Sequence, residues 1–201
     1  MKKIFGGIEL GENFGGYEIA NLPVNKLPQD VATAMGAANS NPLLGATYSP
    51  IWYVGKQTVN GVNYFFIAED IRATKNKDKS IVGLIINVPP SEQAIQGAGA
   101  KVVSIIESEE LLPEVQTAFA TVEKELKGVS YRPVIYIGKQ TVRGENHFIV
   151  CESKVLYPGA QPKAVIFVIN IFEGTPSIVG ILPISSEEKE QQKLFGYAFT
   201  W

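Results

Sequence analysis

The chain has 201 residues, of which 45% are apolar, enough for one large hydrophobic core or two small ones. Its 18 basic and 20 acidic side chains nearly balance, so no basic surface for nucleic acid or an anionic membrane is expected. The single cysteine excludes an internal disulfide, and no stretch approaches the ~20 apolar residues of a membrane span.

The N-terminal sixteen residues do not read as a signal peptide, because Gly6, Gly7, Glu9 and Glu12 interrupt the apolar run that one requires. A chain without disulfides also suits a reducing compartment. We therefore expect a cytoplasmic or otherwise intracellular protein, or a secreted one if a leader has been removed.

The first predicted element is a short helix over residues 28–38, which Gly36 and the breaker at 39–42 cut short. Four strands rich in β-branched and aromatic residues follow, near 51–59, 62–71, 80–88 and 101–106. Asn60-Gly61 separates the first two and is a strong hairpin signal, because both positions of a type I′ turn need positive φ. A long link, from Pro89 to Ala100, joins the last two strands.

The second half repeats this order of elements. A helix is predicted over 111–127, where Val115, Phe119, Val122 and Leu126 fall on one face. The segment GKQTVNGVNYF at 55–65 then returns as GKQTVRGENHF at 138–148, an offset of 83 residues (138 − 55), with similar flanking pieces. Arg143-Gly144 is a poorer type I′ sequence than Asn60-Gly61, so a longer or bulged second loop stays open.

The repeat predicts a duplicated domain. We place the first copy at 1–108, with the N-terminal segment, and the second at 109–201, with an aromatic C-terminal tail that we expect to dock. Each copy reads as α+β, one helix packed on a four-stranded antiparallel sheet, since without the helix the apolar sheet face would be left in water.

The hairpin segments resemble the Q-x-V-x-G loop of cystatins, the inhibitors of papain-type cysteine proteases. The order of one helix and then four strands is also similar to that family, as is Phe14-Gly15-Gly16 ahead of the first helix, and the absence of cysteine pairs resembles its stefin branch. The second hairpin of each copy, at 89–91 and 173–176, departs from the Pro-Trp or Leu-Pro of that family. The second copy also has no N-terminal segment directly before it.

The resemblance implies two tandem cystatin-like domains that bind a protease reversibly and block its cleft, with no catalytic residue, metal or cofactor. The implied protease-binding residues are Gly15, Gly16, Gln57, Thr58, Val59, Asn60, Gly61, Gln140, Thr141, Val142, Arg143 and Gly144. A glycine-containing tip has little bulk, and two paired strands leave it little freedom to lose on binding.

The residues themselves argue against an enzyme. His147, the only histidine, lies four residues from Cys151 on one predicted strand, ~13 Å away by strand rise, too far for a nucleophilic pair. One histidine and one cysteine cannot make a structural zinc site. Glu69 and Glu152 recur once per copy, so they are not a paired acid and base.

Two other functions stay open. The first is a non-inhibitory protein-binding or adaptor module that uses its exposed sheet faces; either Trp52 or Tyr53 must face away from the helix, so some exposed aromatic surface is expected. The second is a small-molecule enzyme or carrier, which would need a polar-lined cavity behind the sheet. The partner is expected to be a protein, and both a monomer and a domain-swapped dimer are compatible with a scaffold that has sheet edges.

Overall fold

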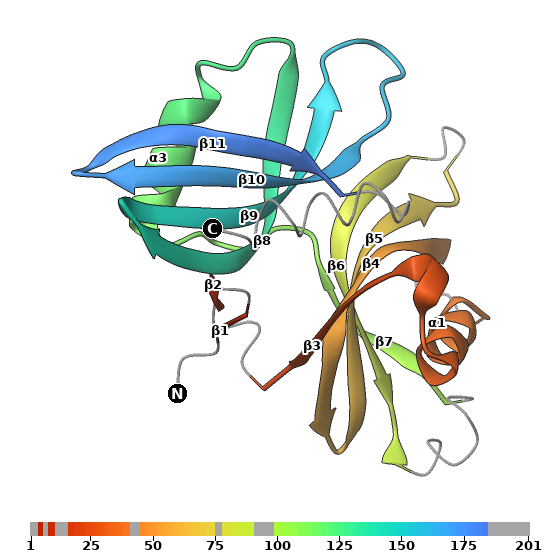
Figure 1. Cartoon of the computed structure of the whole chain (residues 1–201). Coiled ribbons are helices and arrows are strands. Elements are labelled where there is room, and N and C mark those ends of the chain that lie inside the picture. The colour runs from red at the N-terminus through yellow and green to blue at the C-terminus, as the bar shows by residue number, and fades with distance from the viewer. Residues whose placement is uncertain are drawn as a thin grey trace. The chain divides into compact units, whose positions relative to one another are not determined.

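The computed structural model describes residues 4–5, 8–10, 16–40, 45–74, 78–90 and 99–184 (Figure 1). The aromatic tail at 195–201, predicted to dock, lies outside these residues. Of the described helices, none is long and apolar enough to cross a membrane.

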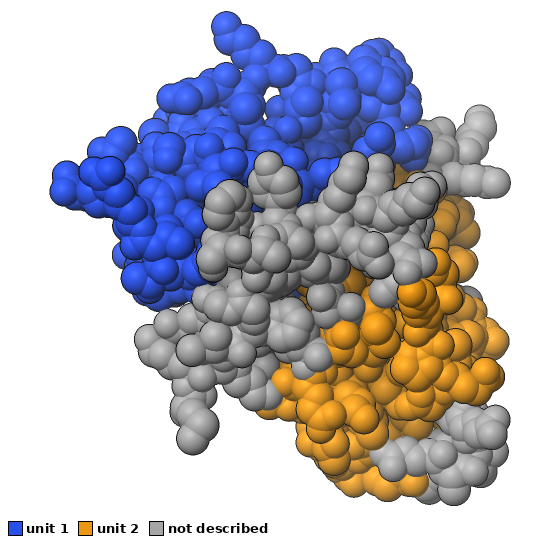
Figure 2. Space-filling view, in the orientation of Figure 1, with its two compact units in different colours: residues 1–15, 108–184, 189–201 blue, residues 16–107, 185–188 orange. Residues whose placement is uncertain are grey.

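Two compact units make up the described chain (Figure 2). In chain order, the first unit comprises residues 16–107 and is orange, labelled unit 2, in Figure 2. The second unit is blue, labelled unit 1, and comprises residues 108–184 together with two N-terminal strands, β1 (Ile4–Phe5) and β2 (Ile8–Leu10). The change of unit at 107–108 lies beside the boundary that the repeat predicts, whereas the start of the chain groups with the second copy and not with the first.

The first unit is an antiparallel sheet in the order β3-β4-β5-β6-β7 with one helix against it (Figure 1). Its elements are β3 (Glu18–Pro23), the 3-10 turn η2 (Val24–Lys26), α1 (Gln29–Ser40), β4 (Ala46–Val59), β5 (Gly61–Arg72), β6 (Lys79–Val88) and β7 (Lys101–Ile106). Val31, Ala34, Met35 and Ala38 fall at helical spacing and form one core with buried residues of the sheet such as Phe66.

The second unit has the same helix and four strands, with β1 and β2 added at the β8 edge. The elements are α3 (Pro113–Glu123), β8 (Val129–Val142), β9 (Gly144–Val155), β10 (Lys163–Phe172) and β11 (Thr175–Pro183). The ring centroids of Phe119 on α3 and Phe167 on β10 lie 5.1 Å apart in its core. The helix ends before Leu126, which still packs against the core from the following turn.

These elements confirm an α+β chain of two helix-plus-antiparallel-sheet domains. The two units are also alike in an irregularity of their first long strand. A register shift lies between Pro50 and Trp52 in β4 and at the equivalent place, between Pro133 and Ile135, in β8. A bulge of this kind bends and twists a long strand. Both units therefore curve their first long strand in the same way.

The additional edge strands are the feature that the sequence analysis missed. In the first unit β3 pairs with β4, Glu18 opposite Lys56 and Ile19 opposite Gly55. In the second unit β2 pairs with β8, Glu9 opposite Lys139 and Leu10 opposite Gly138, which are the same positions of the repeat. The strands are themselves similar: FGGIEL at 5–10 returns nine residues later as FGGYEI at 14–19. Each unit thus has its own copy of one edge strand.

Of the two aromatic residues of which one was expected to face away from the helix, it is Trp52 that does so, but it is only 5% exposed. Trp52 pairs in register with Ile67, on the sheet face away from the α1 core. Phe65 shares that face and is buried too, with its ring 5.7 Å from that of Tyr17. Both faces of the first sheet therefore bury apolar side chains.

Candidate functional site

The first candidate site is the tip of the β4–β5 hairpin. Val59 and Gly61 face each other across the turn, with Asn60 at the bend. Thr58, Val59 and Asn60 are exposed, and Val59 keeps 44% of its surface in water although it is a large apolar residue at the end of a well-paired strand. The tip thus offers an apolar side chain on a turn that the two paired strands hold in place.

The backbone and the packing around Gly61 explain why this position is a glycine. Its φ is +102°, and a Cβ atom there would overlap the carbonyl oxygen of Val88 on the neighbouring strand. Gly144 is in the same position in the second unit, against the carbonyl of Ile171. The close approach of the neighbouring strand, β6 in the first unit and β10 in the second, therefore requires this glycine of the Q-x-V-x-G pattern. This holds whether or not the tip binds a partner.

Gly16 lies beside the first tip. Its φ is +83°, and a Cβ atom there would stand 2.6 Å from Nε2 of Gln57. Gly16 therefore lies within contact distance of Gln57, the first residue of the Q-x-V-x-G segment. Gly15, its predicted companion, lies outside the described residues.

The second tip, between β8 and β9, is a turn of the same length, with Val142 opposite Gly144 and Arg143 at the bend, so the longer loop is not formed. Thr141, Val142 and Arg143 are exposed, Val142 at 41%. The Arg143 guanidinium stacks 4.8 Å above the ring of Phe172, and Nδ2 of Asn170 donates to the Arg143 carbonyl at 3.2 Å. The second tip is thus fastened to β10.

A row of three amides runs behind each tip. In the first unit Gln57 lies opposite Asn63, whose Oδ1 accepts a 2.8 Å hydrogen bond from Asn87. Gln140, Asn146 and Asn170 repeat this row 83 residues later, with an Asn170–Asn146 bond of 2.9 Å. The sequence analysis missed these rows, although the shared offset of all three residues was a signal for them.

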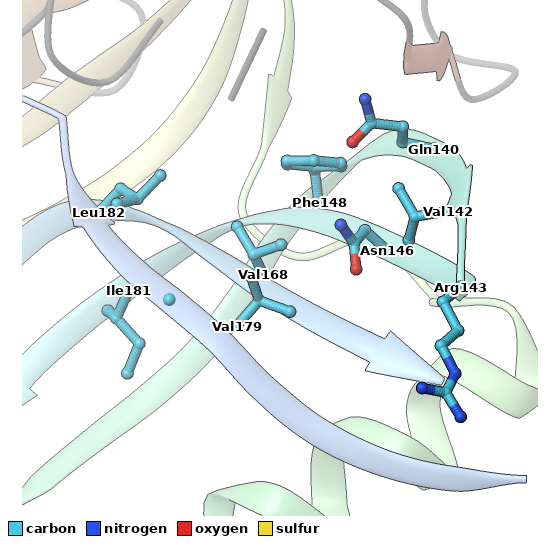
Figure 3. Close-up of a pocket in the computed structure, with 10 residues that line it drawn as sticks. Gln140, Val142, Arg143, Asn146, Phe148, Val168, Val179, Ile181 and Leu182 are labelled. Carbon is cyan, nitrogen blue, oxygen red and sulfur yellow. The ribbon is translucent and has the colours of Figure 1, made fainter. Parts of the chain in front are cut away.

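In the second unit the amide row borders a hollow of about 590 Å³ (Figure 3). Apolar side chains from β9, β10 and β11 line most of it, among them Phe148, Val168 and Val179. Gln140 reaches it from the hairpin; it is only 6% exposed, and its Oε1 has no hydrogen-bond partner in the part of the chain described. Among the described residues that line the hollow, Arg143 is the one titratable side chain.

A polar cluster lies near the other face of the second sheet, around His147. The imidazole is only 1% exposed; its Nδ1 is 3.0 Å from the Tyr136 hydroxyl and its Nε2 is 3.8 Å from Oε2 of Glu145. Donor atoms of His147, Glu145 and Glu114, from the first turn of α3, all lie within 4.8 Å of one another. Burial lowers the pKa of His147 and outweighs the nearby carboxylates, which act to raise it.

The sequence analysis considered only one histidine and one cysteine as metal ligands and so missed this group. The two carboxylates come from different elements, and only the fold brings the start of α3 over β9. Cys151 lies apart in the helix-facing core, where burial raises the pKa of its thiol and keeps it protonated.

The sequence matches no protein-family model and no curated protein.

Proposed function

We propose that the protein is a reversible inhibitor of papain-type cysteine proteases, built from two cystatin-like units. The observation that carries the proposal is that Gly16 lies against Gln57, so that the described residue of Phe14-Gly15-Gly16 stands beside the first Q-x-V-x-G segment. The resemblance requires these two elements to act together.

The physical basis is an apolar tip that is already ordered. Burying the exposed part of Val59 against a protease would contribute about 1 kcal/mol, since complete burial of a valine is worth roughly 1.5–3 kcal/mol. The hairpin loses little conformational entropy on docking, because both of its strands are paired up to the turn. Inhibition would come from blocking the cleft and needs no reactive group.

The proposal extends to the second tip. Val142 is exposed like Val59, and β2 lies against β8 in the register that the start of β3 has against β4. FGGIEL at 5–10 gives the second unit an equivalent of the FGGYEI segment. The stacking of Arg143 on Phe172 makes this tip less able to adapt its shape to a protease, so we expect it to bind more weakly than the first tip.

Titration of papain with the purified protein tests the proposal. We expect inhibition that Val59→Asp weakens at least about 30-fold, or ~2 kcal/mol, because the desolvation cost of the new carboxylate adds to the lost apolar burial, and that Val142→Asp weakens less. Val103→Asp is the matched control, because Val103 is also an exposed valine but lies on β7, away from the hairpin tip.

No inhibition by the intact protein at about 10 micromolar would reject the proposal. Equal effects of Val59→Asp and Val103→Asp would reject the tip as the binding site. The alternative, a non-inhibitory binding or adaptor module on the same duplicated scaffold, would then be the better description.

A further inference from the structure

We propose that the second unit binds one divalent transition-metal ion, best matched by zinc, between Nε2 of His147 and the carboxylates of Glu114 and Glu145. The proposal concerns the helix-facing side of β9 and does not depend on protease binding. Its three donors come from the first turn of α3 and from two positions, two residues apart, on one face of β9.

The spacing of the donor atoms is close to what a zinc ion needs. Zinc binds imidazole nitrogen and carboxylate oxygen at about 2.0–2.2 Å, which in a tetrahedron places neighbouring donor atoms about 3.3–3.6 Å apart. Nε2 of His147 and Oε2 of Glu145 are 3.8 Å apart, and no pair in the group exceeds 4.8 Å. Rotation of the two glutamate side chains, moving their oxygens by about 1 Å, would bring all three donor atoms to the spacing of a tetrahedral zinc site.

The surrounding residues hold the imidazole and one carboxylate in place. The Tyr136 hydroxyl lies 3.0 Å from Nδ1 of His147, so a proton on Nδ1 can be donated to that oxygen while the lone pair on Nε2 faces the two glutamates. Lys139 donates to Oε1 of Glu145 at 2.6 Å, and Oε2 is the oxygen nearer to His147. Such outer contacts commonly fix the orientation of metal ligands.

An unexplained atom points to a ligand. Nε2 of His147 is buried and has no hydrogen-bond partner in the described part of the chain. Buried polar atoms are nearly always satisfied, and an orphan costs free energy unless something binds it. A metal ion between Nε2 and two carboxylates would satisfy this nitrogen and offset the repulsion between the carboxylates.

The first unit shows what the same place looks like when it is only structural. There Tyr64 replaces His147, and its hydroxyl donates to Oδ2 of Asp30, in the first turn of α1, at 2.8 Å. Val62 stands where the second unit has Glu145. In the first unit the helix and the sheet therefore meet here through one hydrogen bond, between Tyr64 and Asp30. In the second unit two different residues on the strand, together with Glu114, make three potential metal ligands.

The donor set favours a particular class of cation. Calcium and magnesium prefer oxygen ligands throughout, whereas imidazole with carboxylates suits zinc and its first-row neighbours. Three protein ligands leave one tetrahedral position for water. Glu114 is exposed, so the group is reachable from solvent.

Calorimetric titration of the metal-stripped full-length protein with zinc chloride tests the proposal, and cobalt(II) absorption reports the coordination. We expect one ion per chain, with binding weakened about 100-fold or more by His147→Tyr and at least about 10-fold by Glu145→Val. Both variants carry the residue of the first unit, so both suit the fold; circular dichroism checks this. Glu125→Gln, which removes an exposed carboxylate just after α3, is the control and should bind like the parent.

Zinc should also raise the unfolding temperature of the parent and of Glu125→Gln but not that of His147→Tyr. Absence of stoichiometric binding up to about 0.1 mM zinc would overturn the proposal. Zinc binding that persists unchanged in folded His147→Tyr would overturn it too, because the ion would then sit on other surface groups.

Discussion

At the scale of single residues, the members of the Q-x-V-x-G pattern divide into two kinds. Gly61 and Gly144 are fixed by the neighbouring strand, whose carbonyl leaves no room for a side chain. Val59 and Val142 are large apolar residues that stay 44% and 41% exposed at the two tips, which leaves apolar surface available to a partner. Within the Q-x-V-x-G pattern, the valines and not the glycines therefore offer surface to a partner.

This division predicts different costs for two alanine substitutions in the first unit. Gly61→Ala should destabilise the unit by more than twice as much as Gly45→Ala, which should cost about 1–2 kcal/mol for the left-handed backbone alone. The reason is that a Cβ atom at Gly45 meets no atom of the described residues within 4 Å, whereas one at Gly61 meets the Val88 carbonyl. Urea unfolding of the two variants measures the difference, and equal costs would contradict the steric argument.

Sequence reasoning predicted the residues at the tips but not the residues behind them. A hairpin turn can be predicted from adjacent residues such as Asn60-Gly61, because its position follows from local backbone preferences. The amide rows and the His147 group join residues from separate elements, and no local pattern encodes such a contact. Alignment of the two copies places His147 where the first has Tyr64, but by itself this exchange indicates no more than another aromatic-sized residue of the sheet.

At the scale of elements, the two short edge strands are the informative ones. The long strands follow from their composition, but β2 has three residues and its partner in β8 lies far along the chain. A strand this short has almost no periodic signal. Its only trace in the sequence is the likeness of FGGIEL to FGGYEI, which becomes meaningful once β3 is known to pair at the matching position.

We predict that removal of residues 1–10 affects only the second unit. Without β2, the edge of β8 at Gly138 and Lys139 loses its partner, so amide exchange at these two residues should quicken by at least about tenfold. Gly55 and Lys56, which pair with β3, should exchange as before and serve as the internal control. Unchanged exchange at Gly138 and Lys139 would show that β2 does not protect this edge.

At the scale of the whole molecule, each unit has its own helix and its own core. Phe66 lies in the core with α1, and Phe167 lies in the core with α3. Domains with separate cores can unfold as separate cooperative transitions. We therefore expect that the two units can be destabilised one at a time.

Scanning calorimetry should therefore resolve two transitions. Phe66→Ala should lower one of them and Phe167→Ala the other, each change costing roughly 3–5 kcal/mol in its own unit. Zinc, if bound as proposed, should raise only the transition that Phe167→Ala lowers. A single transition that both variants lower equally would mean that the units unfold as one.

The paired edge strands also have a consequence for synthesis on the ribosome. Glu9 is translated about 130 residues before its partner Lys139, so β2 emerges long before β8 exists. The nascent chain meanwhile presents the edge of β4 at Gly55 and Lys56, where β3 pairs in the register that β2 will later use on β8. The segments FGGIEL and FGGYEI are similar enough that either can be expected to pair with this edge before β8 is made. The ring contact of Tyr17 with Phe65 is one that the segment with Ile8 cannot form, so it favours the pairing of β3.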